Sequence, residues 1–214
     1  FGAPTKETEA KCPNCKADCE AFEDEPWADE ARRYYIGIVG KYGPQVQSVL
    51  QKAAGLEIEK ICPLHGPILT KDLGKYLKLY DAWSSYTPEE SGIAVCYSSV
   101  YGHTRAAVEF LVDQIRAQAN GPLPIAVFDL ARNDMADAVA HAHRYDRVVL
   151  ATTTYNMEIF PCMKDFISHL QTSCFQKRKV ALIENGSWAP NAQNIMRQML
   201  SECADLTICE NCVT

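Results

Sequence analysis

The stretch Ile93-Ala94-Val95-Cys96-Tyr97, with the loop and helix that follow it, decides the fold class. A short apolar run with β-branched residues predicts a strand that is buried on both faces. The next seven residues, Ser98-Ser99-Val100-Tyr101-Gly102-His103-Thr104, predict a polar turn. From about residue 104 to 118 apolar residues return at helical spacing, which predicts a helix. A strand, a loop and a helix in this order form the repeating unit of a parallel sheet.

This unit recurs to the end of the chain. We expect strands over residues 93–97, 124–130, 147–151, 180–183 and 206–209, and helices over 104–118, 135–143, 162–170 and 192–203. Strands that alternate with helices predict an α/β fold with a doubly wound, five-stranded parallel sheet. In such sheets ligands bind outside the carboxyl ends of the strands, so the loops after the strands are where a site is sought.

The first 88 residues follow a different pattern. Residues 11–25 are polar and rich in cysteine and acid, residues 29–54 have helical spacing with a break at Gly43-Pro44, and residues 71–86 predict another helix. Residues 87–91 are the expected linker. The alternation of strands and helices that a self-contained domain needs is not visible here. Together with the start at Phe1, this pattern predicts that the chain is a piece of a longer protein.

Composition narrows the classes of function. The 214 residues carry 21 basic and 27 acidic side chains, a formal net charge of -6, which argues against a nucleic-acid-binding surface. With 47% hydrophobic and 22% charged residues, the chain is globular in composition. Neither a membrane-spanning run nor a signal peptide is visible, so we expect a cytoplasmic protein. Ten cysteines without a secretory signal are then expected to be mostly reduced thiols.

Three of the loops at the predicted carboxyl edge carry unusual residues. Hydroxyls and backbone N–H groups from Ser98 to Thr104, at the start of a helix, favour a phosphate monoester held by neutral donors. The alternative is a capped turn without a ligand. The loops 152–157 and 184–190 each set an aromatic residue, Tyr155 or Trp188, beside small polar residues, which suits a flat heteroaromatic ring. The loop after the second strand shows nothing unusual.

These loops resemble the flavodoxin-like domain of flavodiiron proteins. The resemblance lies in residues 93–104, in Thr154-Tyr155-Asn156 and in Glu184-Asn185-Gly186-Ser187-Trp188-Ala189-Pro190. Four earlier blocks resemble the end of the metallo-β-lactamase-like domain of the same family: residues 30–35, 39–43, 62–67 and 80–84. The resemblance therefore implies a partial metallo-β-lactamase-like segment over residues 1–88 and a flavodoxin-like domain over 89–214.

The resemblance implies that the chain binds FMN. Its phosphate would be held by Ser98, Ser99, Val100, Tyr101, Gly102, His103 and Thr104. The isoalloxazine ring would be framed by Thr153, Thr154, Tyr155, Asn156 and Met157 and by Asn185, Gly186, Ser187 and Trp188. In the family the flavin passes electrons to a non-haem di-iron site that reduces O2 to water or NO to N2O. The resemblance also implies a homodimer and an electron donor such as a rubredoxin or an NAD(P)H-linked reductase.

The iron ligands of the family are mostly missing from this sequence. The H-x-E-x-D-H run of the family is absent here. Only His65 matches a metal ligand of the family, namely its last iron-binding histidine. In this polypeptide a plain loop histidine is the stronger interpretation, and we expect di-iron only in a complete parent protein. Cys12, Cys15 and Cys19, with the pair Cys209 and Cys212, have spacings typical of zinc or iron–sulfur ligands. The first three are the group in which a metal is worth testing.

Three functions remain open at this stage. The chain is either the FMN-binding electron-transfer portion of a flavodiiron oxygen or nitric oxide reductase, a stand-alone FMN redox carrier or adaptor, or a structural flavodoxin-like module without flavin. Whether the chain itself is an enzyme stays undecided. No helix is predicted after residues 206–209, although a fifth helix would normally cover the sheet, and this favours a truncated piece.

Overall fold

The computed structural model describes residues 26–187 and 189–210. Five parallel strands form its sheet in the order β2-β1-β3-β5-β6, and the short β4 pairs antiparallel with β3. The strands are β1 (Glu90–Tyr97), β2 (Ile125–Asp129), β3 (Tyr145–Tyr155), β4 (Glu158–Ile159), β5 (Lys179–Asn185) and β6 (Thr207–Ile208). Leaving β4 aside, this is the strand order of a flavodoxin-like doubly wound sheet, as the sequence predicts.

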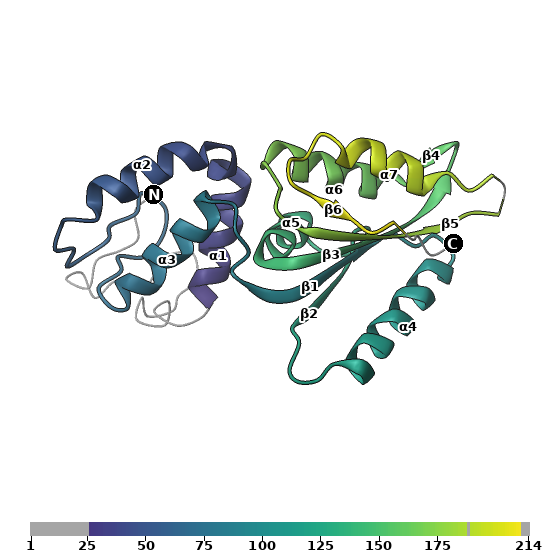
Figure 1. Cartoon of the computed structure of the whole chain (residues 1–214), viewed down its shortest axis with the longest axis horizontal. Helices are drawn as coiled ribbons and strands as arrows, with labels where there is room; N and C mark the ends of the chain where they lie inside the picture. The colour runs from purple at the N-terminus through teal and green to yellow at the C-terminus, as the bar shows by residue number, and fades with distance from the viewer. Residues whose placement is uncertain (1–25, 188, 211–214) are drawn as a thin grey trace.

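Helices cover the two faces of the sheet unequally. Figure 1 shows α4 (His103–Gln118) on one face and α5 (Met135–Arg144), α6 (Pro161–Thr172) and α7 (Ala192–Leu200) on the other. Successive side chains of β1 enter opposite layers: Val95 packs in the layer under α4, whereas Ala94 and Cys96 pack in the layer on the other face of the sheet. The larger of the two cores is the one under α5, α6 and α7, where Phe166 and Met163 are fully buried.

The N-terminal part of the described chain is helical. It consists of α1 (Pro26–Tyr34), a π-helical turn (Tyr35–Val39), a 3₁₀ turn (Gly40–Tyr42), α2 (Gly43–Ala53) and α3 (Leu73–Ser84). The predicted break at Gly43-Pro44 coincides with the start of α2, which follows a distorted stretch over residues 35–42. Pro44 occupies the first turn of α2, where its missing N–H has no helical partner to lose.

Several strands are longer than the sequence pattern predicts. β1 begins at Glu90, inside the expected linker, while β3 and β5 run on to Tyr155 and Asn185 through residues that we expected in loops. The polar residues there still pair along the sheet, because the backbone ladder continues beyond the apolar run. α7 ends at Leu200, three residues earlier than expected.

A buried ion pair joins the N-terminal helices to the sheet. The guanidinium of Arg32, on α1, donates through Nε and Nη2 to the carboxylate of Glu89, with 2.8 Å between Nη2 and Oε2. The indole Nε1 of Trp83, on α3, donates to the same carboxylate at 2.5 Å. The side chains of Arg32 and Glu89 are only 3% and 8% exposed. One carboxylate just before β1 therefore fastens two helices to the start of the first strand.

A second buried contact lies at the C-terminal end of α5. The ring of His143 shares a hydrogen bond of 2.9 Å with the hydroxyl of Ser173, and Arg178 donates to the carbonyls of His143, Tyr86 and Gln176. Burial, with the nearby Arg178 charge, lowers the pKa of His143 to about 3.

Within residues 26–187 and 189–210, no helix is long and apolar enough to span a bilayer.

Removing the Glu89 carboxylate is predicted to destabilise the fold strongly. In Glu89→Ala the Arg32 guanidinium stays buried with only the exposed Asp29 as a partner, so we expect a loss of about 3–5 kcal/mol in the free energy of unfolding. Urea denaturation followed by circular dichroism measures this loss. Glu30→Ala, which removes an exposed partner of Arg33, is the matched control and should cost under about 1 kcal/mol. Equal losses in the two variants would contradict the prediction.

His143 is predicted to make stability depend on pH in acid. Its pKa is about 3 in the folded chain and about 6.5 when exposed, so the unfolded chain binds the proton first. Its contribution to stability is complete above pH of about 6.5 and falls below it, by up to about 1.4 kcal/mol per pH unit. Urea titrations between pH 4 and 7 should show a shallower slope for His143→Gln than for the wild type or for His141→Gln. Parallel slopes in all three proteins would rule this out.

Candidate functional site at the carboxyl edge of the sheet

The register of the parallel strands brings the three predicted loops together. Tyr97 pairs with Ala151 and Thr153 pairs with Asn185, so β1, β3 and β5 reach the same edge. The predicted site residues that follow these strands are therefore neighbours, as the sequence analysis requires.

Hydroxyl and amide groups then join the loops to one another. The hydroxyls of Ser98 and Thr152, both fully buried, lie 2.6 Å apart. The hydroxyl of Thr153 donates to the carbonyl of Asn185 at 3.0 Å, and the Asn185 amide donates to the Thr104 hydroxyl at 3.4 Å. Residues from all three loops thus form one hydrogen-bonded group at the end of the sheet.

The first loop has the features of an anion cradle. Gly102 precedes α4 with a φ of +94°, a backbone conformation that favours glycine, and it supplies no side-chain cap to the helix. Ser99 Oγ accepts from the backbone N–H groups of Gly102 and Arg105 and so closes the turn. Thr104 is buried, whereas Tyr101 is 89% exposed. Ser99 thus occupies the Arg105 N–H, and the other N–H groups in the first turn of this 16-residue helix, those of His103 and Thr104, are placed where they can bind an anion.

Two neighbouring helices have their first turns filled by the chain itself. The carboxylate of Asp134 accepts from the N–H groups of Ala136 and Asp137 at the start of α5. At the start of α7, Thr154 Oγ1 accepts from Asn191 and Ala192, and Glu184 accepts from Gln193. α6 begins with Pro161, which has no N–H to offer. Among these four helices at the edge, α4 is the one that is best arranged to receive an anion.

The second predicted loop is a β-hairpin, which corrects the sequence-based assignment. Thr154 pairs with Ile159 and Tyr155 pairs with Glu158, leaving Asn156 and Met157 as a two-residue turn with φ values of +51° and +64°. This is the conformation of a type I′ turn, for which Asn is common and Gly, rather than Met, is usual at the second position. The side chains of Tyr155 and Met157 are exposed at its tip. Because Thr154 caps α7, its hydroxyl is already engaged within the protein.

The third loop is closely packed where it leaves β5. A Cβ added at Gly186 would lie 3.2 Å from Pro190 and 3.3 Å from Thr154 Oγ1, so a side chain there would press on the cap of α7. Ser187 is exposed. Trp188, the aromatic residue expected to stack on a ring, lies outside the described residues.

A cavity of about 210 Å³ lies beside the first loop. It is lined by residues 99–102 and also by three residues that sequence reasoning missed, namely Arg105, Asp129 and Arg132. Asp129 and Arg132 belong to the connection after β2, the loop that showed nothing unusual in the sequence. A base in the first turn of α4, where acids are normally favoured, was the available clue to Arg105.

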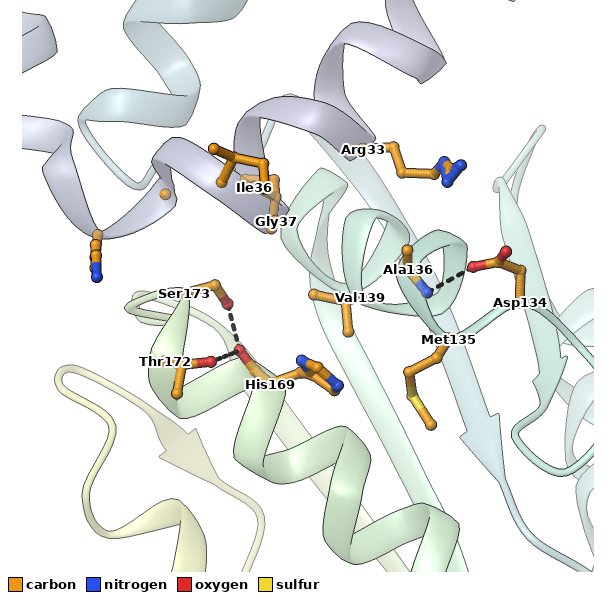
Figure 2. A pocket seen from close by; sticks show the side chains of 13 residues that line it. Arg33, Ile36, Gly37, Asp134, Met135, Ala136, Val139, His169, Thr172 and Ser173 are labelled. Carbon is orange, nitrogen blue, oxygen red and sulfur yellow. Dashed lines mark hydrogen bonds between the residues drawn. The ribbon is translucent and has the colours of Figure 1, made fainter.

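Two larger hollows lie elsewhere. One, of about 810 Å³, runs between the β3–β4 hairpin and α6, and of the predicted site residues it contains Tyr155 and Asn156. The other, of about 650 Å³, lies between the π-helical turn and the helices α5 and α6; Figure 2 shows Ile36 and Gly37 facing Val139 and His169 across it. This second hollow contains none of the predicted cofactor residues, so we place the site at the loops.

The predicted metal ligand, His65, is not part of these loops. His65 is exposed, and its ring contacts the ring of Tyr34, with centroids 5.3 Å apart. In the described part of the chain, no three histidine, cysteine or acidic side chains are grouped as a metal site. Cys12, Cys15, Cys19 and Cys212 lie outside the described residues, and Cys209 is exposed with a free thiol. The role of His65 therefore stays a prediction.

Comparison with models of known families assigns the sheet and its loops to one family. The family model described as "Flavodoxin domain" matches residues 94–207, more than half of the chain. The chain belongs to the flavodoxin domain family. The matched residues contain β2 to β5, the first residue of β6 and all three loops at the carboxyl edge.

Similar flavodoxin-domain chains include larger proteins. A nitric oxide reductase from Moorella thermoacetica is 25% identical over 175 residues, which cover 80% of this chain and 43% of that protein. An anaerobic nitric oxide reductase flavorubredoxin from Shigella flexneri is 19% identical over 176 residues, covering 81% of this chain and 36% of its own length. The chain thus spans less than half the length of these two relatives.

Solved structures confirm the fold and the resemblance to flavodiiron proteins. The rubredoxin oxygen:oxidoreductase of Desulfovibrio gigas superposes with a TM-score of 0.76 at 18% identity, over 88% of this chain and 47% of that one. A flavo di-iron protein variant from Thermotoga maritima gives 0.74 at 20% identity, over 87% and 46%. The superposed part extends beyond the flavodoxin domain, so the N-terminal helices belong to the shared fold as well.

The hydroxyl of Thr154 is predicted to hold the third loop in place. In Thr154→Val the N–H groups of Asn191 and Ala192 lose their acceptor, which should lower the free energy of unfolding by about 0.5–2 kcal/mol. The rate of amide hydrogen exchange should rise at the start of α7. Urea denaturation measures the loss in the free energy of unfolding. Thr172→Val, which removes an exposed hydroxyl bonded to its own helix, is the control. Unchanged exchange at α7 would show that the cap does not order the loop.

Proposed function

We propose that the chain is the FMN-binding, electron-transfer portion of a flavodiiron-type oxidoreductase. The observation that supports this most directly is the loop of residues 98–104 at the start of α4, where Gly102 offers no side-chain cap and where Ser98 and Thr104 are joined by hydrogen bonds to the two loops that would frame a ring. The family match and the names of the relatives support the same proposal. Substrate preference between O2 and NO belongs to the complete protein and is not part of the proposal.

The residues present fit FMN. Its phosphate would occupy the cradle formed by residues 98–104, with Thr104 Oγ1 and the N–H groups of the first turn of α4 as donors. The isoalloxazine would lie between residues 153–157 and 185–188, where Tyr155 and Met157 provide exposed apolar surface. The bound flavin would supply one- and two-electron transfer, while the protein supplies binding, orientation and contacts to the edge of the ring.

The partners are proposed from the same resemblance. Rubredoxin appears in the names of two of the similar proteins, so we propose a rubredoxin-type protein or an NAD(P)H-linked reductase as the electron donor. A di-iron centre, with His65 as one ligand, would belong to the complete parent protein. A homodimer is also proposed, and sedimentation of the flavin-loaded protein tests it. The alternative, a stand-alone carrier, shares the flavin and differs in having no iron and no turnover with O2 or NO.

Titration with FMN tests the core of the proposal. Fluorescence of added FMN should be quenched at a stoichiometry of one per chain, and the absorption spectrum should change on binding. Thr104→Val should weaken FMN binding by about 1.5–3 kcal/mol, the value of a hydrogen bond to a charged group. Thr172→Val again serves as the control. A protein that binds neither FMN nor riboflavin would refute the proposal and leave only a structural role for the domain.

A further inference from the structure

The cavity beside the first loop is charged in a way that the loop itself does not explain. Its lining combines residues 99–102 with two arginines and one aspartate, which come from α4 and from the β2–α5 connection. With both arginines and the aspartate ionised, the lining carries one excess positive charge. The whole chain, by contrast, carries a formal net charge of -6. The charge of the cavity lining is therefore opposite in sign to the net charge of the chain.

Arg105 is placed where a helix normally disfavours a cation. It is the third residue of α4, and the first turn of that helix contains no acid to offset the positive end of the helix dipole. Its guanidinium nevertheless folds back over the loop: Nη2 lies 3.9 Å from the position that a Cβ on Gly102 would take. The one carboxylate partner recorded for it, Glu109, is 3.8 Å away, and both side chains are more than half exposed. Such a pair contributes little, so the position of Arg105 is not explained by Glu109.

Arg132 reaches the same cavity from a rigid connection. Its Nη1 lies 2.7 Å from Oδ2 of Asp129, a carboxylate that is only 10% exposed. The connection is held by the Leu130 N–H, which donates to the Tyr97 carbonyl at 2.8 Å, and by Asn133 Oδ1, which accepts from the Asp129 N–H. Arg132 therefore neutralises the acid that would otherwise repel an anion at the loop. Among the charged residues that line the cavity, Arg105 is left without a carboxylate partner, since Glu109 is not part of the lining.

The phenol of Tyr97, at the end of β1, lies near the same charged groups. Burial and the Asp129 charge raise its pKa, while Arg105 and Arg132 act in the opposite direction, so both arginines lie within electrostatic range of the end of β1. Glu109 is the other acid that contributes there. These are the charged groups of α4 and of the β2–α5 connection that act on the Tyr97 phenol, and of them Arg105, Asp129 and Arg132 line the cavity.

We propose that Arg105 is a specificity-determining residue of the phosphate subsite, and that Arg132 supports it by neutralising Asp129. The proposal rests on the proposed FMN function and adds that recognition depends on charge: a phosphorylated flavin is selected over riboflavin by a cation as well as by neutral loop donors. Charge-assisted hydrogen bonds are about twice as strong as neutral ones, and partly exposed charge pairs weaken with salt. Discrimination should therefore fall as ionic strength rises.

The test compares FMN and riboflavin on the apoprotein, with binding followed by quenching of flavin fluorescence at several NaCl concentrations. We expect Arg105→Gln to raise the Kd of FMN roughly 10- to 100-fold, the equivalent of losing one charged hydrogen bond, and to leave the Kd of riboflavin unchanged. The dependence of the FMN Kd on salt should also become flatter. Arg105→Lys should restore part of the affinity, and Arg116→Gln, an exposed arginine farther along α4, should behave as the wild type.

A second set of variants separates charge from structure. Arg132→Gln should weaken FMN because it exposes the Asp129 charge to the phosphate, and adding Asp129→Asn to it should recover affinity. An unchanged FMN Kd and salt dependence in Arg105→Gln would overturn the proposal, as would an equal loss of riboflavin binding, because that would show a structural effect. If the wild-type chain binds neither flavin, the proposed function itself fails; if it binds FMN and riboflavin equally, only this inference fails.

Discussion

The parallel register of β1, β3 and β5 is the constraint on which the site depends. Successive residues of a strand face opposite sides of the sheet, so Val95 can enter the α4 layer only if Cys96 enters the other. Once the apolar residues are placed in this way, Ser98 must leave the sheet beside Thr152, and their hydroxyls meet at 2.6 Å. The start of the loop proposed to hold phosphate is thus positioned by the same pairing that buries the core, rather than by the loop itself.

The distribution of capping groups then determines where an anion can bind. α5 and α7 start at the same edge of the sheet as α4, yet their N–H groups already have acceptors in Asp134, Thr154 and Glu184. At α4 the first turn contains no acid and carries Arg105, which is unfavourable for an empty helix end and favourable for one that binds an anion. On a chain with a net charge of -6, local cations also offset the general repulsion of an anion.

Much of the fold could be predicted because the buried strands are continuous apolar runs. The parts that could not be predicted are those where polar residues belong to a strand or a hairpin. Residues 152–155 were assigned to a loop because threonine and tyrosine after an apolar run suggest an exit from the sheet, yet they continue β3 into a hairpin. The turn itself lacks the Asn-Gly or Asp-Gly pair that marks a hairpin, since Met157 takes the second position.

The site could be predicted only as far as its members lie in recognisable loops. Ser98, Thr104 and Asn185 were found in this way, and the structure brings them into one hydrogen-bonded group. Arg132 could not be found, because its loop is ordinary in sequence and its role depends on Asp129 being turned inward. Such a contribution arises from the packing of one connection against another. It becomes visible only when β1 and β2 are seen side by side.

A charged cluster lies at each end of β1. Glu89, which holds Arg32 and Trp83, precedes the strand, and the loop that would hold phosphate follows Tyr97. Eight residues of extended chain span about 26 Å, well beyond the distance within which substitutions usually couple. The attachment of the N-terminal helices and the recognition of an anion are therefore energetically separate. Because both depend on the same strand, that strand fixes the orientation of the proposed flavin site relative to the N-terminal helices without linking their energies.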